Sequence, residues 1–232
     1  MSDDTDAVDD GDTGPGEGAD SGPTESADSG PTEGATDPVD ERDAHGWPFE
    51  LRGVTETVVT TLGPNGRWNV AALGVHAGDP ATARTYGRTR TWRNFRERGG
   101  GYVQVTRDPV DFVEAALAVR EESDPVLESA DAWVRVAVTE RDETDEDGTP
   151  VVTWTLDPRE AGVERERVPT TNRGHAAVIE GTVAASRLGV PAFDTATLRE
   201  RLAYFESVVE RCGGPRERRA WERLTDLVEA EW

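Results

Sequence analysis

The spacing of apolar residues changes once along this chain, and the change predicts two kinds of structure. Between residues 54 and 157, apolar and polar residues alternate in short runs, which is the period of strands with one buried face. After residue 166 the apolar residues recur every three or four positions, as they do along one face of a helix. The predicted fold class is therefore mainly β with α, a β-rich domain followed by a small C-terminal helical region.

Turn residues join the alternating runs into antiparallel hairpins. The runs VTETVVTTL (54–62) and RWNVAALGV (67–75) flank the turn GPNG (63–66), where Asn-Gly readily adopts the positive φ angles of a tight hairpin turn. A second hairpin is expected because an acidic loop ending in Asp-Gly separates two more alternating runs. These runs are AWVRVAVTER (132–141) and PVVTWTL (150–156), and further strands are expected at 82–87 and 102–108.

Start and stop residues mark four helices. Pro109 stands at the first position of a helix that follows the strand at 102–108. Asn172 is expected to cap a helix that stops before Gly189, and Asp194 or Thr195 to cap the next. Pro215 opens the last helix after a pair of glycines. We expect the last two helices to form an αα-hairpin.

Acidic residues are concentrated at the N-terminus. The chain has no Lys, 25 Arg and 47 acidic residues, with a formal net charge of −22. Residues 1–44 hold 15 of the acidic residues and one Arg, and they repeat ADSGPTE at 19–25 and 27–33. A segment with so little to bury cannot offset its ordering entropy. We therefore expect a disordered acidic tail over 1–46, a barrel domain over 47–166 and a helical region over 167–232.

The charge and the cysteine count exclude several function classes. An acidic surface has no basic patch to concentrate phosphates, so nucleic acid and anionic membranes are not expected partners. A Lys-free acidic surface is also similar to that of cytosolic proteins from extremely halophilic microbes. The single Cys212, the lack of a signal-peptide pattern and the lack of an apolar run of about 20 residues indicate a cytoplasmic protein. Three His and one Cys without ligand spacing predict no metal site.

The segment TYGRTRTWRN (85–94) concentrates groups that bind anions. It contains three Arg, three Thr and an Asn within ten residues. Guanidinium forks and hydroxyl groups donate hydrogen bonds to phosphate oxygens. Two interpretations stay open on composition alone: a phosphate site, and an exposed Arg-rich connection that pairs with an acidic surface.

The order of four motifs resembles a known family. TETVVTT, NVAALGV, RTRTWRN and YVQVTRDPVDF follow one another as they do in the FMN-binding split-barrel superfamily, which includes flavin reductases. The chain is more closely similar to an archaeal family, domain of unknown function 447. Its segment TTNRGHAAVIEGTVAASRLGV (170–190) resembles the second conserved region of that family. The resemblance implies an antiparallel, Greek-key-like split β-barrel and a homodimer with FMN bound across its two-fold interface.

The resemblance also implies which residues hold the cofactor. Small residues beside the first hairpin strand would let the backbone approach the flavin ring, and the Arg-rich segment would clamp the phosphate. The implied ring contacts are Asn69, Ala71, Ala72 and Gly74, and the implied phosphate contacts are Arg88, Thr89, Arg90, Thr91 and Asn94. No residue is identified as a catalytic acid or base.

Three functions remain open at this level. The first is an NAD(P)H-dependent flavin oxidoreductase, in which the nicotinamide lies over the bound flavin. The second is a flavin carrier or binding module without turnover. The third is a split barrel for another phosphorylated ligand of the pyridoxal or pterin type, because Thr91, Asn94 and the Arg side chains would hold any phosphate.

Overall fold

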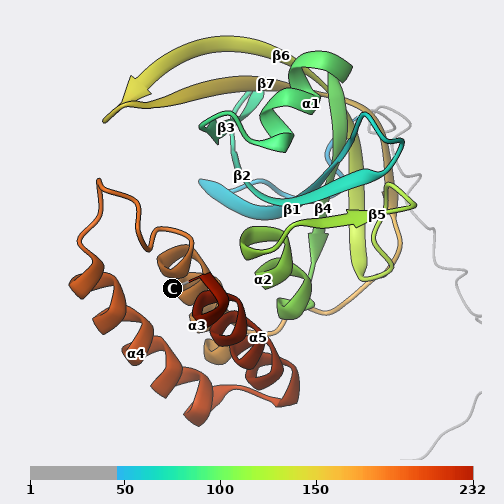
Figure 1. Cartoon of the computed structure of the whole chain (residues 1–232). Coiled ribbons are helices and arrows are strands. Elements are labelled where there is room, and N and C mark those ends of the chain that lie inside the picture. Colours follow the sequence, from blue (N-terminus) through green and yellow to red (C-terminus); the bar gives the residue numbers. More distant parts are fainter. Residues whose placement is uncertain (1–45, 232) are drawn as a thin grey trace, which may run out of the picture. The chain divides into compact units, whose positions relative to one another are not determined.

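The computed structural model describes residues 46–231 (Figure 1). The acidic tail expected over 1–46 lies outside this part, apart from its last residue. Seven strands and five helices follow one another in the described part. They are β1 (Val54–Leu62), β2 (Trp68–His76), β3 (Ala81–Tyr86), α1 (Arg90–Arg98), β4 (Gly100–Thr106), α2 (Pro109–Leu117), β5 (Arg120–Glu122), β6 (Ala130–Glu146), β7 (Thr149–Val163), α3 (Arg173–Ala185), α4 (Thr195–Cys212) and α5 (Pro215–Glu231).

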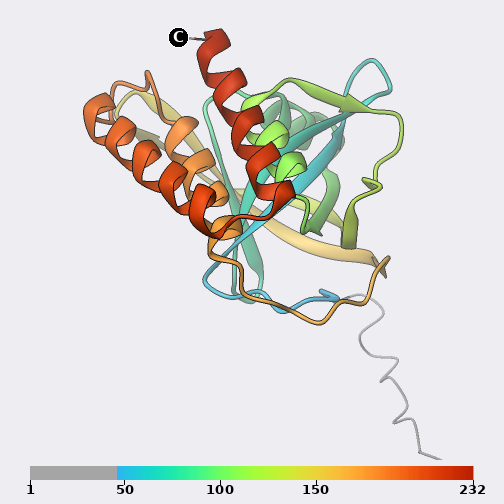
Figure 2. The same ribbon diagram turned by 90° about the horizontal axis from the view of Figure 1, so that it is seen from below.

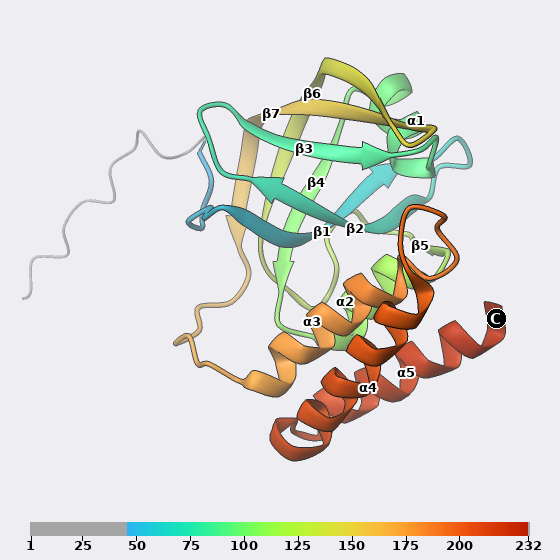
Figure 3. The same cartoon turned by 90° about the vertical axis from the view of Figure 1, so that its left-hand side faces the viewer.

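Six strands close into an antiparallel barrel (Figure 3). They pair in the order β1-β4-β6-β7-β3-β2, and the pairing of β1 with β2 completes the ring. The short β5 adds to the free edge of β2. The expected split β-barrel with C-terminal helices is therefore confirmed. Sequence alternation placed the two long hairpins correctly, but it did not predict β5, which has only three residues.

The barrel is split because β2 shares one of its edges between two partners. On one side β2 pairs with β1 over all nine residues. On the other side it pairs with β3 at Val75 and His76, and with β5 at 68–70. Among the described strands, nothing pairs with this edge of β2 at 71–74. The backbone N–H and C=O groups of that edge are therefore open at the split.

Inward-facing side chains fill the barrel. The buried cluster draws alternate residues from every barrel strand, as the period of two requires. Helix α1 covers one end of the barrel and inserts Phe95, whose ring packs edge-to-face on Trp154 with centroids 5.4 Å apart. The cluster contains Val59, Leu73, Val75, Ala81, Ala83, Phe95, Val103, Val134, Val136, Val152, Trp154 and Leu156.

Helix α1 forms where the sequence analysis left an Arg-rich connection. The side chain of Thr89 caps it by accepting a hydrogen bond from the Trp92 amide, and Gly99 ends it with φ 69°. Thr91, Asn94 and Phe95 are its buried residues. This i, i+3, i+4 spacing was present in the sequence, but polar Thr and Asn at two of the three positions concealed the buried face.

The C-terminal helices pack differently from the expected αα-hairpin. Helix α4 packs mainly along α3, whereas α5 packs mainly against α2, beside which Figure 2 shows it. Trp221 of α5 lies against Gly181 of α3, where a Cβ atom would come within 2.3 Å of the indole. None of the described helices is long and apolar enough to cross a membrane.

We expect Gly181→Ala to destabilise the helical region. The added methyl group would press on the buried Trp221 ring, and overpacking of this kind costs about 1–3 kcal/mol. The measurement is the free energy of unfolding in denaturant. Arg199→Ala, at an exposed position of α4, is the control and should change it by less than about 0.5 kcal/mol. Equal stability of the two variants would contradict this packing.

Candidate functional site

Buried polar side chains gather beneath helix α1. Asn69 of β2 donates from Nδ2 to Thr91 Oγ1 at 3.5 Å, and Asn94 donates from Nδ2 to Thr61 Oγ1 at 3.0 Å. Asn94 is 1% exposed, and its Oδ1 atom has no hydrogen-bond partner in the described structure. The structure thus brings together three of the residues expected to hold the cofactor. Their side chains are buried under the start of α1, which they hold against the barrel.

The run of small residues divides between the two faces of β2. Asn69 and Ala71 face the barrel interior, where Ala71 packs on the main core. Ala72 and Gly74 face outward, and Ala72 packs with Phe112 of α2. These four side chains therefore do not share one surface. The backbone of these residues, rather than their side chains, forms the open edge of β2 at 71–74.

A hollow of about 190 Å³ lies on the outer face at the split. Ala72, Leu73 and Gly74 supply its β2 wall, and Arg84 and Tyr86 supply its β3 wall. The floor comes from β1, α2 and α3. The remaining lining residues are Glu56, Phe112, Ala116, Thr182, Val183 and Ser186. One wall of the hollow thus carries small residues at Ala72 and Gly74, and the other carries the larger, polar Arg84 and Tyr86.

The side chain of Glu121 lies beside the start of α1. The carboxylate of Glu121 on β5 contacts Arg90 Nη1 at 3.2 Å and accepts from Asn65 Nδ2 at 2.9 Å. Arg67 also donates from Nη2 to the Glu121 carbonyl oxygen at 2.9 Å. Glu121 is paired with Asn69 in the β2–β5 register, so it stands next to the buried polar cluster. The carboxylate of Glu121 therefore occupies the space in front of the Arg90 guanidinium.

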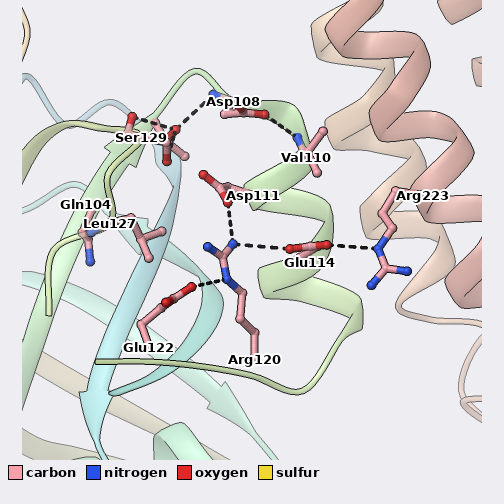
Figure 4. Close-up of polar contacts among 11 residues, drawn as sticks. Gln104, Asp108, Val110, Asp111, Glu114, Arg120, Glu122, Leu127, Ser129 and Arg223 are labelled. Carbon is pink, nitrogen blue, oxygen red and sulfur yellow. Dashed lines mark hydrogen bonds and ion pairs between the residues drawn. The ribbon is translucent and has the colours of Figure 1, made fainter. Parts of the chain in front are cut away.

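Arg120 fixes the strand that carries Glu121 (Figure 4). Its guanidinium bonds Asp111 of α2 through Nη1 and contacts Glu122 at 2.8 Å through Nε. Glu114 of α2 lies 3.5 Å from Arg120 and 3.1 Å from Arg223 of α5. The ion pairs therefore connect β5 to two helices. Because Arg120 is only 22% exposed, solvent screens them less than surface pairs.

The other predicted phosphate contacts lie on or just before α1. Thr89 uses its hydroxyl to cap the helix, and Arg88 lies over the Trp92 ring at 5.6 Å. Sequence analysis missed Asn65, Arg67 and Glu121. Glu121 contacts Asn65 and Arg67, from which it is separated by 56 and 54 positions in the sequence. The only sequence signal for these contacts was the presence of polar residues in the turn at 63–66 and in the segment at 120–122.

Among the titratable side chains that line the 190 Å³ hollow, Glu56 has a shifted pKa. Burial raises the pKa of the Glu56 carboxyl, the charge of Glu180 raises it further, and Arg187 and His76 oppose the change. A raised pKa means that the folded state binds a proton more readily than the unfolded state. Between the two pKa values the folded state holds more protons, so stability falls as the pH rises through that window.

We expect Glu56→Gln to raise the thermal midpoint at pH 7, because it removes a carboxylate whose charged form is disfavoured in the fold. The gain should shrink as the pH falls below the ordinary Glu value of about 4.3, where wild-type Glu56 is protonated in both states. Thermal melts across this pH range test it. A gain that is the same at every pH would show that charge is not the cause.

Two family models match this chain. The model described as "Protein of unknown function (DUF447) N-terminal domain" matches residues 55–165. A second model, "Protein of unknown function (DUF447)", matches residues 172–226. The two matches cover more than half of the chain. Their ranges contain the barrel with the split and most of the C-terminal helices.

The fold is also similar to solved structures. An FMN-bound DUF447 protein from Methanosarcina mazei is 26% identical with a TM-score of 0.66, covering 76% of this chain and 96% of its own. The styrene monooxygenase flavin reductase of Pseudomonas putida S12 is 11% identical with a TM-score of 0.38, covering 50% and 93%. Flavoredoxin from Methanosarcina acetivorans is 10% identical with a TM-score of 0.38, covering 53% and 78%.

Proposed function

This chain belongs to the DUF447 family, and from that premise and the geometry of the split we propose that it is a cytoplasmic FMN-binding protein. One observation carries the proposal: among the described strands, the backbone edge of β2 is unpaired at 71–74, and a hollow lies against that edge. The M. mazei relative, which is FMN-bound, supports the choice of ligand.

The open edge suits the polar side of a flavin ring. Amide and carbonyl groups at 71–74 can pair with the alternating C=O and N–H groups of the ring's pyrimidine edge. Ala72 and Gly74 leave room for the ring to approach the strand, because neither extends beyond Cβ. Backbone groups placed at such an edge fix the orientation of a ligand in a largely apolar pocket.

The start of α1 suits the phosphate. Its first-turn N–H groups carry the positive end of the helix dipole, and Arg88, Thr89 and Arg90 stand there. Thr91 and Asn94 act from the inside by holding α1 on the barrel. The proposal therefore keeps all the residues predicted from the sequence and divides their roles. Some contact the ligand, and the buried ones position the helix.

The dimensions of the hollow favour a homodimer. Its volume of about 190 Å³ is smaller than the ~300–1,000 Å³ usual for ligand pockets. A flat ring laid on the β2 edge would keep one face open to water. A second copy of the chain would cover that face and complete the pocket. FMN and the dimer should therefore stabilise each other.

Bound FMN would supply the chemistry of hydride acceptance and donation. The residues of this chain would bind and orient the flavin and exclude water from it. A carrier without turnover would use the same contacts. Reduction of the bound flavin by NADH or NADPH separates an oxidoreductase from a carrier.

The first test is gel filtration of the full-length protein with excess FMN in a buffer of about 2 M KCl, where charge repulsion is screened. We expect flavin absorption to elute with the protein. Ala72→Leu should fill the split and lower the affinity for FMN and riboflavin alike by more than about tenfold. Ala176→Leu, at an exposed position of α3, is the matched control. A folded wild-type protein that elutes without flavin would refute the proposal.

Glu121 should compete with the phosphate for Arg90. Glu121→Gln removes that competition, so we expect FMN affinity to rise by about three- to tenfold while riboflavin affinity stays the same. Glu122→Gln, on the same strand but paired with Arg120, should leave the ratio of the two affinities unchanged. Titration followed by flavin fluorescence measures both. An equal effect on riboflavin would place the phosphate elsewhere.

A further inference from the structure

A second, larger hollow lies on the barrel away from the split. Its volume is about 420 Å³, within the range of small-molecule sites. It is formed by the ends of β1 and α1, the starts of β2 and β4, the middle of β6 and the second half of β7. It shares no lining residue with the first hollow. The lining residues are Leu62, Trp68, Arg98, Gly99, Gly100, Gly101, Tyr102, Arg135, Val136, Ala137 and Arg159.

Three consecutive glycines create this hollow. A Cβ atom on Gly100 would lie 2.4 Å from the Val136 carbonyl oxygen, and one on Gly101 would lie 2.6 Å from that of Thr60. The close approach of β4 to its neighbours therefore requires glycine at both positions. As a consequence, no side chain covers the barrel at 99–101, and the surface is hollowed there.

Aromatic rings form one wall and hold each other in place. Trp68 and Tyr102 pack edge-to-face with centroids 5.4 Å apart, and Tyr102 also contacts Trp133 at 5.6 Å. A ligand ring that stacks here would meet side chains whose rotamers are already restricted. Binding would therefore cost less side-chain entropy than at an isolated surface aromatic.

Arginine side chains supply the charge of the hollow. Arg98, Arg135 and Arg159 line it, and none of the lining residues is acidic. Arg135 and Arg159 each contact one neighbouring carboxylate, at 3.0 Å from Glu160 and 2.6 Å from Asp157. A guanidinium has five N–H donors, so these pairs leave donors for another anion. In a chain with a net charge of −22, such a site is a local exception.

We propose that this hollow binds a flat aromatic ligand that carries an anionic group, a carboxylate or a phosphate. The aromatic wall receives the ring, and the guanidinium groups receive the anion. The site is independent of the flavin at the split, because the two hollows are built from different residues. A substrate, electron donor or effector of this chemistry would bind here while the split is filled.

The probes are AMP and benzoate, titrated calorimetrically into the full-length protein loaded with one equivalent of FMN, because excess FMN is itself a flat aromatic phosphate that could enter this hollow. Adenosine, which lacks the charge, and cyclohexanecarboxylate, which lacks the aromatic ring, are the matched ligand controls. At least one of the two probes should bind about tenfold tighter than its control. Binding of AMP alone assigns the site to phosphates, and binding of benzoate alone assigns it to carboxylates.

Arg98→Gln and Arg159→Gln locate the binding. Each should weaken the bound probe by about fivefold, because it removes a charged donor at an exposed position where folding does not depend on it. Arg93→Gln, at an exposed position of α1 outside the hollow, should leave the affinity unchanged. The proposal is overturned if neither probe binds with a Kd below about 10 mM, or if both variants bind the probe as tightly as wild type.

Discussion

The structure depends on how one strand satisfies its backbone hydrogen bonds. Strand β2 is fully paired with β1, but its second edge is divided between β3 and β5. Buried backbone groups must find partners, and a barrel normally provides them by full closure. Here the partners separate at 71–74, which leaves an edge that a ligand can complete. The split, the hollow beside it and the proposed function all follow from that divided edge.

Helix α1 contacts the barrel core on one side and carries charged side chains at the surface on the other. Its inner side supplies Phe95 to the core and Asn94 to the buried polar cluster. Its outer side carries Arg90 to the carboxylate of Glu121. Core packing therefore sets the position of the Arg90–Glu121 ion pair, because any movement of α1 would move the Arg90 guanidinium as well. Within residues 46–231, this packing leaves Asn94 Oδ1 buried without a hydrogen-bond partner.

The sequence predicted the parts of the fold that have a local pattern. Period-two alternation located β1 and β2, and Asn172, Asp194 and Pro215 marked helix starts that the structure confirms. Helix α1 was missed because its inward positions are mostly polar. The contacts of Glu121 were missed because a three-residue strand in a polar segment has no period to detect. The motif order led to the family, whereas the unpaired edge of β2 at 71–74 required coordinates, because it depends on where β3 and β5 pair.

The ion pairs around Arg120 connect the C-terminal helix α5 to β5 at the edge of the barrel. The guanidinium of Arg120 on β5 contacts Glu114 of α2, and Glu114 also forms an ion pair with Arg223 of α5. The chain's last helix thus reaches the strand beside the split through two arginines and one carboxylate. Removing α5 would take Arg223 away from Glu114 and alter the charge balance around Arg120. Helix α5 therefore contributes to the electrostatic environment of β5, although it follows the barrel by more than 50 residues in the chain.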